Sequence, residues 1–185
     1  MAAPTQKIME ISSFVSKLLR QNFGKGPLSC YPFSRSRFLI FYIRGFLSPI
    51  ENVLIENQDI DNAKISRNVV MKTILTELKG ILELEFQQDV QSLYHDWNYL
   101  NNTGMITAVF EKEIPSFKSV EQFPEYKDFI GEVERISILV QKKPDKIEAF
   151  QITPKLYLVK RYGILVPIEK ALIENGYEQA LLVTK

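Results

Sequence analysis

A thirteen-residue segment occurs twice in this chain, and this repeat constrains the possible folds more than any other feature. Residues 45–57, GFLSPIENVLIEN, return without a gap as residues 163–175, GILVPIEKALIEN, with nine of thirteen positions identical. Upstream of each copy, a proline (Pro27 or Pro144) is followed by two short strand-like runs. Since self-similarity of this kind marks repeated supersecondary units, we expect two copies of a unit made of helix, loop, hairpin and helix.

The first copy is expected to form a complete unit over residues 1–112. Apolar residues at three- and four-residue steps predict helices from about Thr5 to Asn22 and from about Ile65 to Gln88. Apolar runs bounded by turn residues predict hairpins at residues 28–44 and 91–111. The expected order is α-β-β-α-β-β, an α+β fold in which amphipathic helices cover antiparallel hairpins.

The second copy is expected to be partial and to need a partner. The segments IPSF and FPE predict a linker over residues 113–127, and the order α-β-β-α then recurs over residues 128–185. The long helix and the closing hairpin have no counterpart, so this half either packs on the first sheet or completes itself with another subunit. The run Phe38–Ile43, apolar on both faces, predicts a central strand or one covered by a partner. We therefore expect a homodimer.

Composition and charge narrow the classes of function. Lys plus Arg (23) against Asp plus Glu (22) leaves a net charge of +1, so no overall field favours DNA, RNA or an anionic bilayer as partner. One cysteine, Cys30, and one histidine, His95, exclude a disulfide framework and a soft-ligand metal site. The longest apolar run is far below the roughly 20 residues that cross a bilayer, and no signal peptide is recognised. We expect a cytoplasmic protein with no membrane span, metal or cofactor.

Three separated blocks of the sequence resemble the MpsC-like family of small bacterial proteins. They are residues 23–27 (FGKGP), residues 44–51 (RGFLSPIE), and His95-Asp96 followed by residues 102–104 (NTG). The resemblance covers residues 8–112 and, more weakly, residues 128–178. The family is named for a sodium-translocating, membrane-potential-generating system, and the resemblance implies a soluble accessory protein with membrane partners. The second copy has QKKP (residues 141–144) in place of the glycine-containing loop, which argues against a shared binding role.

The FGKGP loop has two interpretations. A phosphate-binding loop leads from a strand into a helix N-terminus, whereas this loop follows the end of a helix. We therefore expect Gly24 to be the left-handed residue that ends the helix. If the protein instead binds a small molecule or an anion, the loop and the returning hairpin strand would supply the site. The candidate ligand residues there are Arg20, Lys25, Gly26 and Arg44.

Two further motifs have structural and functional interpretations. Residues 48–51 (SPIE) have the spacing of a capping box, with Ser48 as N-cap and Glu51 at the third helical position; a catalytic glutamate is the alternative. His95 lies beside Asp96, but neighbours on a strand point to opposite faces and cannot form a dyad. We expect His95 to be a hydrogen-bonded sheet residue, with a ligand or pH-switch role as the alternative.

Arginines and aromatic residues alternate on the first hairpin, which is also typical of single-strand nucleic-acid platforms. The near-neutral net charge argues against that function. The chain has no paired-carboxylate spacing, nucleophile elbow or Walker loop, so no catalytic residue is predicted. We expect a non-enzymatic accessory or regulatory protein that contacts a membrane-associated ion-transport partner. The alternative is a small-molecule or anion-binding domain, an enzyme included, centred on the FGKGP loop or His95.

Overall fold

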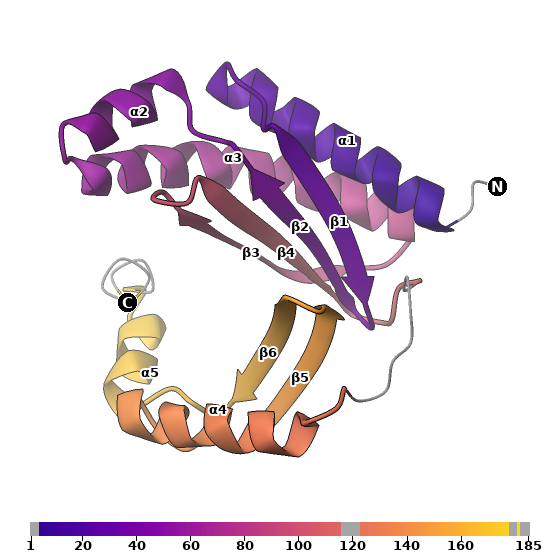
Figure 1. Ribbon diagram of the computed structural model, residues 1–185, viewed down its shortest axis with the longest axis vertical. Helices are drawn as coiled ribbons and strands as arrows, with labels where there is room; N and C mark the ends of the chain where they lie inside the picture. Colours follow the sequence, from indigo (N-terminus) through magenta and orange to yellow (C-terminus); the bar gives the residue numbers. More distant parts are fainter. Residues whose placement is uncertain (1–3, 116–122, 178–180, 182–185) are drawn as a thin grey trace. The chain divides into compact units, whose positions relative to one another are not determined.

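The first unit of the chain contains two α-β-β modules joined by a short helix. The computed structural model describes residues 4–115, 123–177 and 181, and divides the chain into units of residues 1–119 and 120–185. The first module is α1 (Pro4–Phe23), β1 (Ser29–Arg35) and β2 (Phe38–Arg44). The second is α3 (Ile60–Phe86), β3 (Val90–Asn98) and β4 (Thr103–Phe110), with α2 (Pro49–Glu56) between them. The predicted α+β class is confirmed (Figure 1).

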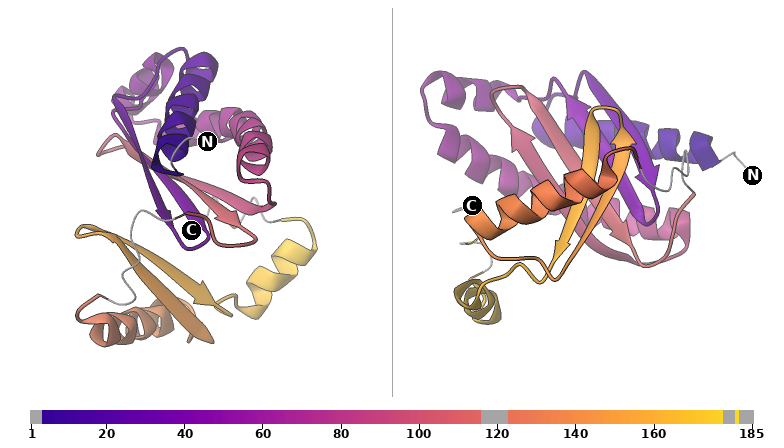
Figure 2. Two further views of the ribbon diagram at one scale, coloured as in Figure 1. Left: turned by 90° about the vertical axis from the view of Figure 1, so that its right-hand side faces the viewer. Right: turned by 60° about the horizontal axis from the view of Figure 1, so that its bottom comes forward.

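The two modules share one antiparallel sheet. Its order is β1-β2-β4-β3, so the inner strands β2 and β4 pair, from Phe38 opposite Val109 to Arg44 opposite Thr103. Helices α1 and α3 cover the same face of this sheet (Figures 1 and 2). The run Phe38–Ile43 therefore lies in a central strand, one of the two environments expected for it.

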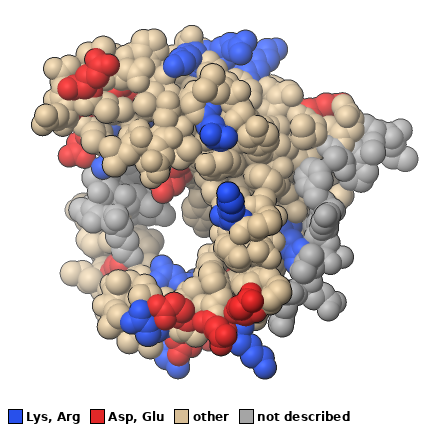
Figure 3. Space-filling view, in the orientation of Figure 1, with Lys and Arg blue, Asp and Glu red and all other residues tan. Residues whose placement is uncertain are grey.

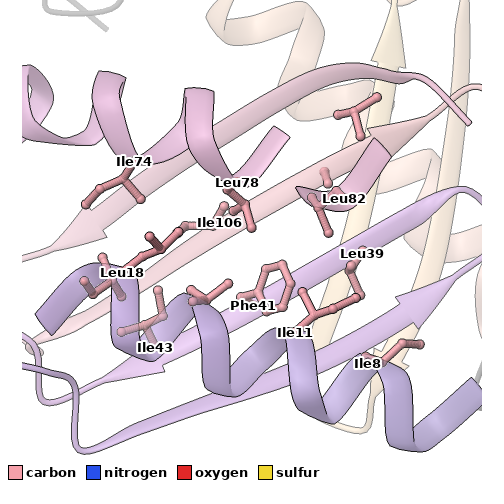
Figure 4. Close-up of a cluster of buried hydrophobic side chains, with 14 of the residues drawn as sticks. Ile8, Ile11, Leu18, Leu39, Phe41, Ile43, Ile74, Leu78, Leu82 and Ile106 are labelled. Carbon is pink, nitrogen blue, oxygen red and sulfur yellow. The ribbon is translucent and has the colours of Figure 1, made fainter. Parts of the chain in front are cut away.

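The hydrophobic core of the first unit lies between these helices and the sheet (Figure 4). Each apolar side chain buried there stabilises the fold by about 1.5–3 kcal/mol. The helices contribute Ile8, Ile11, Val15, Leu18, Leu19, Met71, Ile74, Leu78 and Leu82, and the strands contribute Leu39, Phe41, Ile43, Ile106, Ala108 and Phe110. This packing holds the ends of the strands in fixed positions.

The boundaries of two segments differ from those expected. Helix α3 begins at Ile60 rather than near Ile65, because the Asp59 side chain accepts a hydrogen bond from the Asn62 amide and caps the helix. The first residues of the predicted linker pack on the first unit. Ile114 is buried in the core, and its amide donates to the Ser36 carbonyl at 2.8 Å. The part of the predicted linker at residues 116–122 lies outside the described residues.

The second unit contains one α-β-β module followed by a short helix. Its elements are α4 (Tyr126–Val140), β5 (Lys146–Thr153), β6 (Leu156–Tyr162) and α5 (Pro167–Glu174). Strands β5 and β6 form an antiparallel two-stranded sheet, and α4 packs against β5. The order of elements is that of α1, β1, β2 and α2. Of the helices described in either unit, none combines the length and apolar character needed to cross a membrane.

Candidate functional site

A buried arginine connects three elements of the first unit. Arg67 of α3 is 1% exposed, and its Nε atom donates to Glu51 Oε1 at 2.5 Å. Its Nη2 atom donates to Glu51 Oε2 at 2.6 Å and to the Phe46 carbonyl at 2.9 Å. Such bidentate, charge-assisted pairs are the strongest class of side-chain hydrogen bond. Arg67 therefore ties α3 to α2 and to the loop that follows β2.

Four aromatic rings surround the same guanidinium group. The Arg67 Cζ atom lies 4.2 Å from the Trp97 ring centroid and 4.9 Å from that of Phe46. The ring centroids of Tyr99 and Phe23 lie 5.3 Å and 5.5 Å from the same Cζ atom, within cation–π range. We call this group the Arg67 cage; its members are Arg67, Glu51, Phe23, Phe46, Trp97 and Tyr99. The cage adds the end of α1 and the β3–β4 turn to the elements that Arg67 holds.

Glu51 belongs both to the cage and to the predicted capping box, which is confirmed. The Ser48 amide donates to Glu51 Oε2 at 2.7 Å, and the Glu51 amide donates to Ser48 Oγ at 3.4 Å. Burial raises the pKa of Glu51, but the hydrogen bonds from Arg67 and the Ser48 amide, with the Arg67 charge, lower it overall. Glu51 is therefore a carboxylate that caps α2 and neutralises Arg67.

Sequence analysis missed Arg67, although a signal was present. Its position continues the buried stripe of α3, one turn from Ala63 and one turn from Met71. A cation on an otherwise apolar helix face must find a buried acid or aromatic partner. The stripe alone does not identify that partner, since Glu51 and Trp97 are distant in sequence.

The predicted residue His95 lies beside the cage. Its Nδ1 atom accepts a hydrogen bond from Trp97 Nε1 at 3.0 Å, whereas Asp96 Oδ1 accepts from the Trp97 backbone amide. Burial lowers the pKa of His95 and the Arg67 charge lowers it further, against the opposing effect of Asp96. Burial also raises the pKa of Tyr99 to about 12. His95 is thus positioned to hold the Trp97 ring against Arg67.

An open hollow of about 680 Å³ lies where β2 ends and β4 begins. This volume is within the usual range for small-molecule sites. Among the described lining residues, Arg44 is the only charged one. The hollow is lined by Leu28, Ser29, Tyr31, Tyr42, Arg44, Gly45, Asn101, Asn102 and Thr103.

Two backbone turns with positive φ shape this hollow. Gly45 has φ +65°, and its amide donates to the Asn102 carbonyl at 2.9 Å. Asn102 has φ +49°, and within the described part of the chain its Oδ1 atom is buried without a hydrogen-bond partner. Buried acceptors are nearly always satisfied in folded proteins. Arg44 is therefore the charged residue that the hollow offers to a ligand, since the Asn102 Oδ1 atom is closed to solvent.

The family model for MpsC, described as a Na+-translocating membrane potential-generating system, matches residues 5–112. This chain belongs to the MpsC family. The match includes every strand of the first unit, the Arg67 cage and the hollow. Searches of curated proteins and of solved structures gave no significant match.

In this MpsC-family chain, one of the five predicted ligand residues lines the hollow. Arg44 returns beside the start of the hairpin as expected, since the Leu28 amide donates to its carbonyl at 3.0 Å, and it lines the hollow. Arg20 instead packs against Gly26, where an added Cβ would lie 2.9 Å from Arg20 Nε. Arg20, Lys25, Gly26 and His95 are not among the lining residues.

The remaining observations concern surface charge, metal ligands and the residue that ends α1. Basic and acidic groups are dispersed on the face shown in Figure 3, and neither sign covers it. Within residues 4–115, 123–177 and 181, no group of three or more His, Cys, Asp or Glu side chains could hold a metal ion. Gly24 has φ +72°, the left-handed conformation predicted for the residue that ends α1.

Proposed function

We propose that this MpsC-family protein is a non-enzymatic accessory or regulatory protein of a Na+-translocating, membrane-potential-generating system. It acts from the cytoplasm by binding a membrane-associated ion-transport partner. The observation that supports this proposal is the family match over residues 5–112, which spans the whole sheet of the first unit. A protein that acts by binding a partner needs a specific contact surface and no catalytic group.

The end of the sheet that carries the hollow offers such a surface. Leu28 and Leu100 are 85% and 87% exposed, and they lie in the α1–β1 loop and the β3–β4 turn. Leu28 also lines the hollow, next to Tyr31 and Arg44. Exposed apolar groups around a single charge are typical of protein interaction sites. We therefore assign the partner contact to this end of the first unit.

Binding to membranes of the source organism tests this function. The tagged full-length protein is incubated with solubilised membranes, and retained proteins are identified by mass spectrometry. We expect an ion-transport subunit to be retained by the wild type and lost with the Leu28→Ser/Leu100→Ser variant. Leu84→Ser, at an exposed position of α3, is the matched control and should retain it. Equal retention by both variants would remove the contact surface from the proposal.

A transport assay tests the accessory role itself. Inverted membrane vesicles are prepared with and without the protein, and the Na+-dependent membrane potential is followed with a voltage-sensitive dye. The proposal predicts that adding wild-type protein to depleted vesicles restores the potential and that Leu28→Ser/Leu100→Ser does not. An unchanged potential in depleted vesicles would contradict the accessory function.

Arg44 at the hollow favours a second candidate function, the binding of a small anion. Bicarbonate, dihydrogen phosphate and nucleotides have this chemistry. Calorimetric titration should show binding that Arg44→Gln weakens at least tenfold, whereas Lys25→Gln in the FGKGP loop leaves it unchanged. The reverse result would place the site at the loop. If none of these anions binds, this candidate function is ruled out.

A further inference from the structure

The first unit contains two α-β-β modules, whereas the second unit, in its described residues, contains one module of the same construction. The first unit pairs α1-β1-β2 with α3-β3-β4, and the described part of the second contains a single such module, α4-β5-β6, before α5. The hairpins also close alike: the Leu28 amide donates to the Arg44 carbonyl at 3.0 Å, and the Asp145 amide donates to the Tyr162 carbonyl at 2.9 Å. Strand β6 thus occupies the position that β2 has in its module.

The outer edge of β6 is unpaired within the described residues. Strand β2 lies between β1 and β4, but β6 pairs only with β5. Since the Tyr162 carbonyl faces β5, the alternate residues Tyr157, Val159 and Arg161 direct their backbone N–H and C=O groups to the other edge. An unpaired row of this kind is a template for another strand.

Helix α4 has an exposed apolar face, whereas the corresponding face of α1 is buried in the core of the first unit. Ile136 follows Leu18 by 118 residues, the spacing that relates Gly45 to Gly163. Leu18 is 1% exposed in the core that α1 and α3 build, whereas Ile136 is 42% exposed. The nearby residues Leu139 and Val140 are also exposed. Among the described residues, the strand edge and the helix face thus lack the neighbours that the second module supplies in the first unit.

We propose that β6 pairs antiparallel with β6 of a second copy of this chain. The resulting sheet has the order β5-β6-β6′-β5′, which reproduces β1-β2-β4-β3, and a two-fold axis perpendicular to the sheet places both α4 helices on one face. In the first unit Phe41, at the centre of β2, pairs with Ile106. Its equivalent 118 residues later is Val159, so the two copies of Val159 lie opposite each other.

The charges of β6 are compatible with this register. Arg161 of each copy lies opposite Tyr157 of the other, a cross-strand pair that a cation–aromatic contact stabilises. Both side chains are on the face that packs against α4, since Arg161 Nη1 donates to Ser137 Oγ and the Tyr157 ring stacks on Phe129. Lys160 lies opposite Leu158, so no like charges face each other. A register centred on Lys160 would oppose two lysines, which is unfavourable.

Disulfide trapping in the full-length chain tests the interface. In a Cys30→Ser background, Val159→Cys should form an intermolecular disulfide under mild oxidation, because paired residues have Cα atoms about 5.5 Å apart. Lys146→Cys on β5 is the matched control. Its two copies would be at least three strand spacings apart, about 14 Å across the sheet, which is too far for a disulfide. Equal cross-linking of both variants would overturn the proposed register.

Sedimentation of the full-length chain tests the dimer itself. The wild type should have twice the 21.4 kDa mass of one chain at micromolar concentrations. Val159→Pro should have the single-chain mass, because it removes an amide on the open edge and leaves the β5 ladder intact. Circular dichroism checks its fold, and if it is unfolded the cross-linking result decides. A monomeric wild type, or a dimer in which Val159→Cys fails to cross-link, overturns the proposal.

Discussion

Replacing Arg67 with methionine removes the cation from the cage while keeping an unbranched side chain of similar reach. The variant leaves the buried Glu51 carboxylate without its counter-ion and the Phe46 carbonyl without its Nη2 donor. Removing one partner of a buried ion pair costs about 3–5 kcal/mol. Since a domain is stable by only about 5–15 kcal/mol, this is a large fraction, and the melting temperature should fall by about 10–20 °C.

A double-mutant cycle separates the ion pair from simple loss of packing. Glu51→Gln removes the charge and keeps the shape, so Glu51→Gln/Arg67→Met should be more stable than Arg67→Met alone by about 1–3 kcal/mol. Urea unfolding measures all four free energies of unfolding. Fluorescence of Trp97, the only tryptophan, and circular dichroism are the two probes. Additive costs would show that Glu51 and Arg67 do not interact.

Protonation of Glu51 at low pH should affect the stability of the wild type and of Arg67→Met in opposite directions. In the wild type the pKa of Glu51 is lowered from 4.5, so its contribution is fully present above pH 4.5 and lost as pH falls through the folded-state pKa. In Arg67→Met, burial remains and the cation is gone, so the pKa rises above 4.5 and protonation stabilises the fold. The difference between the proteins should therefore shrink on acidification. A constant difference from pH 7 to 4, or a cost under about 1 kcal/mol, would refute the reasoning.

Three glycines and one histidine give further predictions. Gly104→Ala should cost about 1–3 kcal/mol in urea unfolding, because its Cβ would lie 1.9 Å from the Trp97 ring. Gly24→Ala meets no atom within 4 Å and should cost only the left-handed backbone penalty of about 1–2 kcal/mol, whereas Gly80→Ala inside α3 should stabilise by about 0.5–1 kcal/mol. A pH titration of Trp97 fluorescence should have its midpoint below 6.5 and disappear in His95→Gln; a midpoint above 6.5 would contradict the burial of His95.

Sequence patterns predicted the features of this fold that depend on near neighbours. The hairpins at 28–44 and 91–111 follow from runs of apolar residues, and the capping box at Ser48 follows from a three-residue spacing. Helix α3 begins about five residues before its predicted start, because the N-cap residue Asp59 precedes the apolar stripe on which the prediction is based. Local spacing therefore identifies elements more reliably than their ends.

The site was predicted less completely because it is assembled from distant segments. Arg44 was identified, since a hairpin necessarily returns beside its origin. Arg67 was missed, because its acid and its aromatic partners lie on other elements, 16 to 44 residues away in the chain. The Asn102 acceptor, which has no partner in the described part of the chain, depends on the shape of one turn, and residue types alone do not determine that shape.

The central position of β2 has a consequence for synthesis of the protein. Its neighbour β4 begins at Thr103, about 60 residues after β2 ends, and at roughly 5–20 residues per second the ribosome needs on the order of 3–12 s to make that stretch. During this interval the nascent chain carries FLIFYIR with one edge unpaired. A segment with high β-propensity and a single charge is an aggregation hazard while it is exposed. The strand that becomes central in the finished sheet is therefore a site of aggregation risk while the chain is being made.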